Sequence, residues 1–525
     1  MGSLVCRTVA SAIANAAERS IVPELAMRSP NPDFKITARH VQPIHEVSLF
    51  KEPAPFTLSF LPLQMKRRHA VALCGLTIAR PESAQPAEST ESRDEKQRMD
   101  RILIIGAGLS GLAAAQKLQS AGHNVVVLEG RDRIGGRIWT STRWPELPLD
   151  LGASWIHGVK GNPLTSLADS IQAQRIATSY DSAIVYDVDG DPLDDEAEES
   201  LEEIREQLFD RIEKAQDKDK DASVLSVAEK LLADLDDDDP KTQRYFNFVL
   251  SGNIEQEYAG SAEELSAHWY DSAKHYPGKD ALFPSGFHVI TKHLSQGLQI
   301  ETGEEVQEIH WQETPVRVVT KTREFTADRI LLTLPLGVLK AGNVRFVPVL
   351  PEKKQTAIDT LGMGVLNKCY LRFPKVFWPN DVDWLEYIAE EHGEWTEWVS
   401  FVRTTGQPVL LGFNAGTRGR EIESLTDEQI VESAMQTLRI LYGDDIPEPT
   451  DFQITRWASD PFARGSYSFC SVGSTPEMRR ELARPLDGKL YFAGEATSVD
   501  YYGTADGAYQ SGLRAAAEIN LCLRR

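Results

Sequence analysis

The sequence predicts an α/β fold, and three neighbouring segments just after residue 100 carry that prediction. Residues 101–105 (Arg-Ile-Leu-Ile-Ile) form an apolar run with the length of a buried strand, and a glycine-rich turn follows at once. Small residues from 112 to 120 predict a closely packed helix, and the apolar run 124–128 predicts a second strand. This order of strand, turn, helix and strand is typical of proteins with a parallel sheet.

Length and composition limit the possible functions. The chain has 525 residues, so we expect at least two domains. Hydrophobic residues make up 41% and charged residues 26%, and no apolar run approaches the length of a membrane span. The 56 basic residues face 78 acidic ones, a formal charge of −22 that argues against a nucleic-acid partner and suits small cations. The five cysteines lack CxxC spacing, so we predict neither a disulfide framework nor a metal site.

Residues 1–99 differ in composition from the remainder. They hold 13 basic and 10 acidic residues, whereas the remainder holds 43 and 68. We predict a mostly disordered or targeting extension. Its sequence fits either an organellar transit peptide or, if translation starts at Met65, a twin-arginine export signal around Arg67-Arg68. A cytoplasmic protein with an untargeted extension is the alternative, so the compartment stays open.

Two later segments show helical signals. Leu201, Ile204, Leu208 and Ile212 fall on one face of an otherwise charged segment, which predicts an amphipathic helix. Ser226 with Glu229 three residues later predicts the capping box of another helix.

The turn after the first strand has the GxGxxG pattern of Rossmann-like dinucleotide-binding domains. Gly106 permits the tight turn, Gly108 lets the backbone approach a pyrophosphate, and Gly111 lets the helix lie close to the strand. Glu129 ends the second strand and can accept hydrogen bonds from ribose hydroxyls, whereas it would repel a 2′-phosphate. We also expect cofactor contacts from Leu109 and Ser110 in the same turn.

The next segment distinguishes FAD from NAD. Arg131 and Arg137 flank the glycine pair Gly135-Gly136 just after the expected ribose position. A glycine pair lets the backbone contact a planar ring or a phosphate, and arginines neutralise phosphate charge.

With these residues the sequence resembles the flavin-containing amine oxidase family, which includes polyamine oxidases, monoamine oxidases and flavin histone demethylases. The resemblance covers residues 100–523. Further motifs that carry it lie at Asp150–Gly158, Thr333–Lys340, Asn367-Lys368, Trp457–Ser468, Phe492–Thr497 and Gly503–Tyr509.

The resemblance implies an FAD-binding domain that is interleaved along the chain with an α+β substrate-binding domain. The FAD-binding domain would comprise residues 100–163, 282–338 and 454–525. The substrate-binding domain would comprise residues 164–281 and 339–453. A C-terminal helix from about Asp506 to Leu521 would point its N-terminus at the flavin, where a helix dipole stabilises negative charge.

The resemblance also implies further FAD contacts. These residues are Gly152, Ala153, Ser154, Trp155, Val306, Trp457, Gly494, Glu495, Thr504 and Ala505. Monoamine oxidases bond their flavin covalently to a cysteine at the position of Ser466, so the resemblance implies that FAD is bound here non-covalently.

Four residues are catalytic candidates by resemblance. Lys368 aligns with a lysine that holds a water against the flavin and assists the reaction with oxygen. Tyr467 aligns with an aromatic wall beside the flavin, and His157 lies where polyamine oxidases place a histidine or an acid facing the substrate. Glu257 resembles an acidic residue of the polyamine tunnel in plant enzymes, although a surface acid is an equal alternative.

The resemblance favours oxidation of a secondary amine of spermine, spermidine or an acetylated polyamine, with oxygen reduced to hydrogen peroxide. Thr504 replaces the second cage tyrosine of monoamine oxidases, and the acidic charge suits a polycation. A monoamine or L-amino-acid oxidase is the alternative. A histone demethylase is more remote, because the insert near 190–240 is too short for the helical tower of those proteins. Trp269, Trp384, Trp395 and Trp398 would line the substrate pocket or belong to the core, and the oligomeric state stays open.

Overall fold

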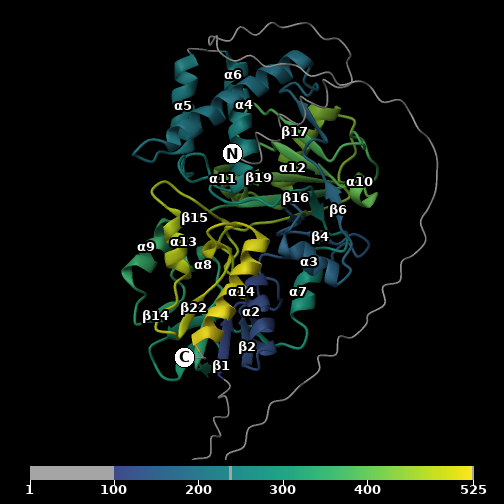
Figure 1. Ribbon diagram of the computed structural model, residues 1–525. Coiled ribbons are helices and arrows are strands. Elements are labelled where there is room, and N and C mark those ends of the chain that lie inside the picture. Colours follow the sequence, from purple (N-terminus) through teal and green to yellow (C-terminus); the bar gives the residue numbers. More distant parts are fainter. Residues whose placement is uncertain (1–99, 236–238, 523–525) are drawn as a thin grey trace, which may run out of the picture. The chain divides into compact units, whose positions relative to one another are not determined.

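The computed structural model describes residues 100–235 and 239–522 (Figure 1). The extension 1–99 and its predicted targeting signals lie outside this range. The predicted order of strand, turn, helix and strand is present as β1 (Arg101–Ile105), α2 (Leu109–Ser120) and β2 (Asn124–Glu129).

β1 is the central strand of a five-stranded parallel sheet with the order β22-β13-β1-β2-β9. The partners come from distant parts of the chain: β9 (Gln299–Thr302), β13 (Arg329–Leu332) and β22 (Leu490–Phe492). Four of the five residues of β1 are buried, as expected for a strand covered on both faces.

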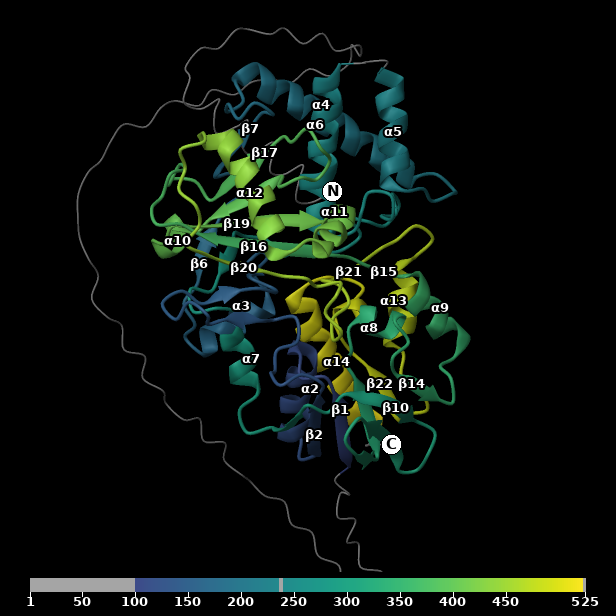
Figure 2. The same ribbon diagram turned by 180° about the vertical axis from the view of Figure 1, so that it is seen from behind.

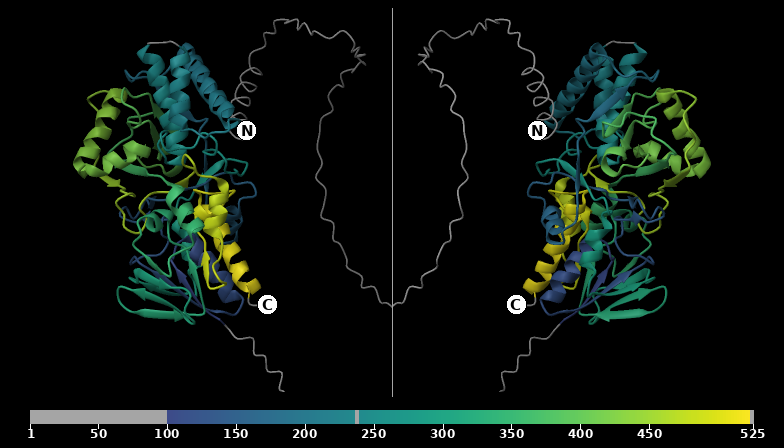
Figure 3. Two further views of the ribbon diagram at one scale, coloured as in Figure 1. Left: turned by 90° about the vertical axis from the view of Figure 1, so that its left-hand side faces the viewer. Right: turned by 90° about the vertical axis from the view of Figure 1, so that its right-hand side faces the viewer.

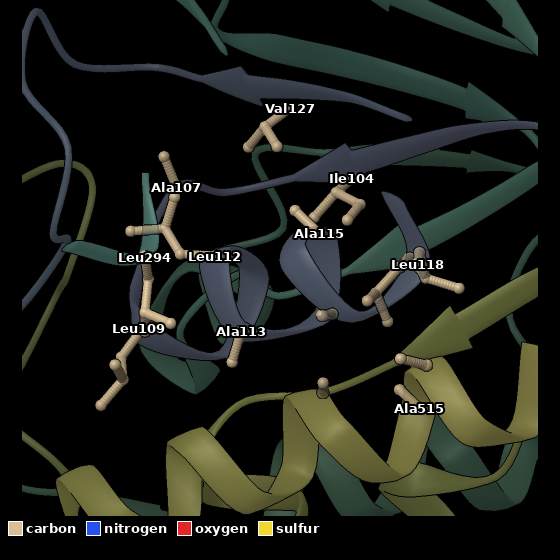
Figure 4. Packing of buried hydrophobic residues seen from close by; sticks show 14 of the residues in the cluster. Ile104, Ala107, Leu109, Leu112, Ala113, Ala115, Leu118, Val127, Leu294 and Ala515 are labelled. Carbon is tan, nitrogen blue, oxygen red and sulfur yellow. The ribbon is translucent and has the colours of Figure 1, made fainter. Parts of the chain in front are cut away.

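Helices α2 and α14 (Ala505–Cys522) cover one face of this sheet, and Figures 1 and 2 show them side by side. Figure 4 shows part of the cluster between them and the sheet, with Ile104 and Val127 on the strands, Leu112 and Ala115 on α2, and Ala515 on α14. A Cβ atom on Gly512 of α14 would lie only 2.1 Å from the carbonyl oxygen of Ser110, so the small residue is required for this close packing.

The other face of the parallel sheet packs on a four-stranded sheet with the order β12-β11-β10-β14. Its strands are β10 (Val306–His310), β11 (Val316–Thr320), β12 (Glu324–Ala327) and β14 (Arg345–Val347). Leu103 and Ile105 of β1 belong to this second apolar cluster, whereas Ile102 and Ile104 belong to the first, as strand alternation requires.

A second large sheet has six strands in the order β20-β16-β19-β18-β17-β7. They are β7 (Ala183–Tyr186), β16 (Leu366–Arg372), β17 (Trp384–Tyr387), β18 (Glu397–Ser400), β19 (Val409–Ala415) and β20 (Asp451–Ile454). One face carries Trp398 and Leu385 against α12 (Asp427–Tyr442), and the other carries Tyr370 and Phe413. Trp395 and Trp398 are therefore core residues.

The predicted amphipathic helix is α4 (Asp195–Gln216), and its four apolar residues are all buried. It packs with α5 (Val224–Leu235) and α6 (Pro240–Phe248), which Figure 3 shows grouped together. The predicted capping box at Ser226 is wrong, because α5 begins earlier and Ser223 Oγ accepts the hydrogen bond from the Ser226 backbone N–H. A π-helix, η1 (Val249–Gln256), continues α6.

Short elements connect these layers. The strands are β3 (Thr140–Ser141), β4 (Leu149–Asp150), β5 (Trp155–Ile156), β6 (Ile176–Thr178), β8 (Asp280–Leu282), β15 (Gly362–Met363) and β21 (Ser468–Phe469). The helices are α3 (Pro163–Ser170), α7 (His288–Leu294), α8 (Leu336–Lys340), α9 (Glu352–Thr360), α10 (Val402–Thr405), α11 (Gly416–Glu421), η2 (Ile422–Ser424), α13 (Pro476–Ala483) and η3 (Glu495–Thr497).

All of these elements belong to one compact unit, so the division into two domains stays a prediction. Within residues 100–235 and 239–522, no helix is sufficiently long and apolar to cross a bilayer.

Candidate active site

The GxGxxG turn has the geometry that its glycines predict. Gly106 adopts a φ of +107°, which disfavours other residues, and a Cβ on Gly111 would lie 2.0 Å from the carbonyl oxygen of Gly106. A Cβ on Gly108, in contrast, would meet no protein atom within 4 Å. The fold therefore requires glycine at positions 106 and 111, whereas Gly108 leaves the backbone open for the close approach of a ligand. Leu109 and Ser110 begin α2 beside it and are buried.

Glu129 is buried at the end of β2, where both carboxylate oxygens accept backbone hydrogen bonds. Oε2 accepts from the N–H of Ala107 at 2.8 Å, and Oε1 accepts from the N–H of Arg131 at 2.9 Å. Each oxygen retains a lone pair, so the carboxylate is positioned to accept the ribose hydroxyls.

The second glycine motif packs directly on the first. The N–H of Gly135 donates to the carbonyl oxygen of Ala107 at 2.8 Å, and a Cβ on Gly136 would lie 3.3 Å from Cα of Gly108. Both glycines have positive φ angles, +99° and +60°. The glycines of the two motifs therefore lie together and expose backbone atoms on one surface, here called the glycine surface.

The arginines of this segment have different roles. The guanidinium of Arg131 makes two hydrogen bonds with Asp460, at 2.7 and 2.9 Å, so it links two distant segments and is already paired. Arg133 lies over the ring of Trp139 at 4.6 Å, and its buried Nη2 has no hydrogen-bond partner among the described residues. Burial, together with the charge of Arg131, lowers the pKa of Arg133 to about 10. A phosphate bound beside Arg133 would offset the repulsion between the guanidinium groups of Arg131 and Arg133.

Arg137 pairs with Glu495, and this pair connects the glycine surface to α14. Nη1 of Arg137 donates to Oε1 of Glu495 at 2.9 Å, while Oε2 accepts from Ser468 Oγ at 2.6 Å and from the N–H of Gly503 at 2.9 Å. Burial alone would raise the pKa of Glu495, but Arg137, the Ser468 hydroxyl and Arg479 lower it below its ordinary value.

A narrow hollow of about 10 Å³, the size of about one water, adjoins this pair. Arg137, Glu495 and the backbone of Gly494 line one side, and leucines 332, 334, 336 and 339 line much of the rest.

Lys368 is almost fully buried in β16, and its amine reaches the predicted 152–155 segment. Nζ donates to the carbonyl oxygens of Asp150 at 2.9 Å and Gly152 at 2.7 Å and to Ser154 Oγ at 2.5 Å, and it lies 5.5 Å from the ring of Trp155. Burial lowers the pKa of Lys368, against the attraction of the Asp150 carboxylate. Burial also raises the pKa of Asp150, against hydrogen bonds from Thr140 and Phe287 and the charge of Lys368.

His157 pairs with Asp280, which the sequence analysis did not single out. Nδ1 of His157 lies 2.9 Å from a carboxylate oxygen of Asp280, and the imidazole is half exposed. Desolvation alone would lower the pKa of His157, but the hydrogen bond and charge of Asp280, with Glu257 and Asp506, raise it to about 9. A pKa raised in this way favours the protonated imidazole at neutral pH.

Tyr467 contacts the backbone of Glu257, whose own side chain is exposed. The Tyr467 hydroxyl donates to the backbone carbonyl oxygens of Gln256 at 2.9 Å and Glu257 at 3.2 Å, at the end of the π-helix. Burial raises the pKa of Tyr467 well above its ordinary value, and the charges of Glu257 and Glu397 act in the same direction. π-Helices occur often at functional sites.

The other predicted cofactor residues lie around the same surfaces. The Trp457 indole N–H donates to the carbonyl oxygen of Leu151 at 3.3 Å. Thr504 Oγ accepts from the N–H of Gly507 at 3.0 Å and so caps α14, which begins at Ala505. Ala153 donates its N–H to the carbonyl oxygen of Arg137, and Val306 is buried against the parallel sheet.

Sequence reasoning missed four acidic residues near this site. Asp280 lies opposite His157 because β5 and β8 pair, and Asp506 is buried in the first turn of α14. Glu386 and Glu397 lie opposite one another on β17 and β18. An acid within an otherwise apolar strand was the available signal for the last two.

Comparison with known proteins shows the family to which this chain belongs. A sequence profile of the family described as flavin containing amine oxidoreductase matches residues 109–520. The chain belongs to this family. Polyamine oxidase 2 of Arabidopsis thaliana is 35% identical over 445 residues, which cover 81% of this chain and 89% of that protein.

Two further similarities involve a histone demethylase homolog and a solved structure. Lysine-specific histone demethylase 1 homolog 3 of Oryza sativa subsp. japonica is 35% identical over 83% of this chain, but the match spans only 56% of that protein. A solved structure of a putrescine oxidase double mutant superposes with a TM-score of 0.66 at 20% identity, covering 81% of this chain and 99% of that one. That structure supports the predicted fold.

The chain is therefore an FAD-dependent amine oxidoreductase. The residues present fit FAD: Gly108 leaves room for a close ligand, Glu129 offers acceptors for ribose, and Arg133 has an N–H without a partner in the part of the chain that the structure describes. Together with the family, these observations confirm the predicted cofactor.

Proposed function

We propose that this protein oxidises a secondary amine of a linear polyamine, namely spermine, spermidine or an acetylated form, and that oxygen is reduced to hydrogen peroxide. The acidic surroundings of His157 carry the proposal, since Asp280, Glu257 and Asp506 all raise its pKa. A site that holds so much negative charge attracts a cation with more than one ammonium group. The similarity to polyamine oxidases supports the same substrate class.

FAD, when bound, accepts a hydride from the carbon beside the amine nitrogen and passes the electrons to oxygen. The amine must be neutral for this step, because an ammonium has no lone pair to assist it. The protonated imidazole of His157, which its raised pKa favours, would donate a hydrogen bond to the substrate nitrogen. A carboxylate would then accept the substrate proton, and Glu257, whose charge acts on both His157 and Tyr467, is the proposed acceptor.

Lys368 would serve the reaction with oxygen. An ammonium at Nζ already makes its three hydrogen bonds with protein atoms, so a water could bind only in place of one of them. The Ser154 hydroxyl can rotate, whereas the two carbonyl groups belong to the backbone. We propose that Ser154 exchanges with this water.

FAD is proposed to bind non-covalently. Ser466, at the position that resembles the site of covalent attachment, accepts from the N–H of Leu366 at 2.8 Å and donates to its carbonyl oxygen at 3.1 Å. Cys470 is buried against Arg479 and Ser272. Acid precipitation should release all flavin into the supernatant.

The deciding experiment follows the visible flavin spectrum of the purified protein without oxygen. Spermine, spermidine, acetylspermine, benzylamine, L-leucine and a dimethyl-lysine peptide are added separately, and air is then admitted. Bleaching by polyamines alone, followed by peroxide formation in air, is the expected result. Bleaching by benzylamine, leucine or the peptide alone would replace the proposal with a monoamine oxidase, an amino-acid oxidase or a demethylase, respectively.

A further inference from the structure

The π-helix η1 ends in the backbone segment that holds Tyr467. The carbonyl oxygens of Gln256, its last residue, and of Glu257, which follows it, accept hydrogen bonds from the Tyr467 hydroxyl. π-Helices are rare and usually only one turn long, so a π-helix of eight residues needs support from outside the helix. The position of Tyr467 therefore depends on the contacts that hold the end of η1.

A histidine–glutamate pair holds this end of η1. Glu255 is buried, and its Oε2 lies 2.8 Å from Nε2 of His392 in the loop that joins β17 to β18. Its Oε1 accepts the N–H of Ala262 at 2.7 Å. Glu255 immediately precedes Gln256 in the chain. The pair thus acts directly beside the carbonyl groups that accept the Tyr467 hydroxyl.

The β17–β18 loop (residues 388–396) is itself fixed, so it can hold the imidazole in place. The side chain of Trp395 is fully buried, and its indole N–H donates to Ser433 Oγ at 2.9 Å. Trp395 has a φ of +47°, a conformation that a bulky residue keeps only when surrounding contacts impose it. A second contact joins the loop to η1, because Ser251 Oγ lies 3.1 Å from Thr396 Oγ1. This contact remains when His392 is replaced.

The charges around His392 favour an ion pair with Glu255. Desolvation alone would lower the pKa of His392, but the hydrogen bond and the charge of Glu255 raise it. Glu390 and Glu394 of the same loop pair instead with arginines of α6 and α11. Among the described residues, Glu255 is the only acid that pairs with His392. Breaking this pair would leave a buried carboxylate without its cation, which is costly.

We propose that His392 is a positioning residue for amine oxidation, which holds Glu255 and thereby fixes the end of η1 that places Tyr467 beside the flavin. The inference rests on the proposed place of Tyr467, and it assigns His392 no contact with the substrate. It goes beyond the proposed function, because the link through Glu255 acts on whichever amine reduces the flavin.

The first test follows amide hydrogen exchange in the oxidised holoprotein without amine. His392→Leu should speed exchange at Ala262 and in η1 about tenfold or more, because a charge-assisted hydrogen bond on a buried carboxylate is lost. Exchange in β1 should stay unchanged. His392→Gln should restore slow exchange, since its side-chain N–H can still donate to Glu255. His310→Leu, which removes a histidine 3.0 Å from Glu308, is the matched control. Unchanged exchange at Ala262 in His392→Leu would overturn the inference.

The second test is a double-mutant cycle on the limiting rate of anaerobic flavin reduction. His392→Leu should slow this rate about three- to tenfold, because the aromatic wall loses its orientation, and His392→Gln should restore it. Tyr467→Phe removes the other end of the same link, so His392→Leu should have almost no further effect in that background. His310→Leu should change the rate in neither background.

The outcomes separate this inference from the proposed function. If the losses from His392→Leu and Tyr467→Phe multiply, His392 does not act through the Tyr467 hydroxyl and the inference is wrong. If a monoamine or an amino acid reduces the flavin and polyamines do not, the proposed function is rejected. The cycle measured with that amine then supports the inference if the losses do not multiply, and rejects it if they do.

Discussion

Nδ1 of His157 lies 2.9 Å from Oδ2 of Asp280, and the second oxygen of the same carboxylate accepts the backbone N–H of Gly158 at 2.8 Å. The aspartate therefore orients both the imidazole and the backbone turn that follows it. The pairing of β5 with β8 brings these residues together although 123 positions separate them in the sequence. The charge state of His157 thus depends on a strand contact.

Asp280→Asn should lower the pKa of His157 from about 9 to its ordinary value of 6.5 or below, because burial is then opposed only by weaker charges. Titration of the imidazole carbon signal by NMR measures this change. Asp271→Asn is the control, since Asp271 raises the pKa of His275 instead. An unchanged pKa of His157 in Asp280→Asn would contradict the assigned cause.

The same pair should make stability depend on pH. The pKa of His157 is raised in the folded protein, so its contribution is complete below pH 6.5 and disappears as the pH rises through about 9. The difference in unfolding temperature between wild type and Asp280→Asn should therefore be larger near pH ~6 than near pH ~10. A difference that does not depend on pH would show that Asp280 stabilises only through Gly158.

Lys368→Met should slow reoxidation of the reduced flavin by oxygen about a hundredfold or more, the usual effect of losing a proton-transfer group. Anaerobic reduction by substrate should change much less. Stopped-flow absorbance measures the two half-reactions separately. Lys354→Met is the control, because that buried lysine donates to the carbonyl oxygens of Glu481, Leu482 and Arg484 at the end of α13. It should lower stability and leave reoxidation unchanged.

Gly108→Ala and Gly512→Ala should differ in what they impair: the first FAD affinity, the second the stability of the flavin-free protein. A Cβ on Gly108 meets no protein atom within 4 Å, so the flavin-free protein should keep its stability while FAD affinity falls about tenfold or more. A Cβ on Gly512 would lie 2.1 Å from the Ser110 carbonyl oxygen, so this variant should lose about 1–3 kcal/mol of stability without FAD. Calorimetry on the flavin-free protein and FAD titration distinguish the two effects.

The local parts of the site were predictable because their chemistry depends on adjacent residues. Gly106, Gly108 and Gly111 lie within one turn, and Glu129 follows at the end of the next strand, so order and spacing suffice. The helix α14 came instead from the resemblance to the family, which placed it from Asp506 to Leu521, and it is observed from Ala505 to Cys522.

The remaining contacts depend on tertiary pairing, which local patterns do not encode. Arg131 was expected to neutralise phosphate, yet it pairs with Asp460, 329 residues away. Glu386 and Glu397 become neighbours only through the register of β17 and β18. A shift of one residue would move one of them to the opposite face of the sheet.

Arg137 and Glu495 should act as a unit that links the glycine surface to α14. Arg137→Met leaves a buried carboxylate without its ion-pair partner, so it should destabilise the flavin-free protein by about 1–3 kcal/mol. Glu495→Gln should cost less, since its amide oxygen still accepts from Ser468 or Gly503. The double variant should therefore be less destabilised than the sum, with a coupling of about 1 kcal/mol, measured by urea unfolding.

The pH dependence of that coupling tests its electrostatic origin. The pKa of Glu495 lies below its ordinary 4.5 in the folded protein, so its contribution is present above pH 4.5 and is lost as the pH falls through the folded value. Arg137→Met raises this pKa, so the variant should lose stability at a higher pH than the wild type during acidification. If both proteins respond alike and the single effects add, Ser468, Gly503 and the charge of Arg479 hold Glu495 without Arg137, and Arg137 is free to serve the cofactor.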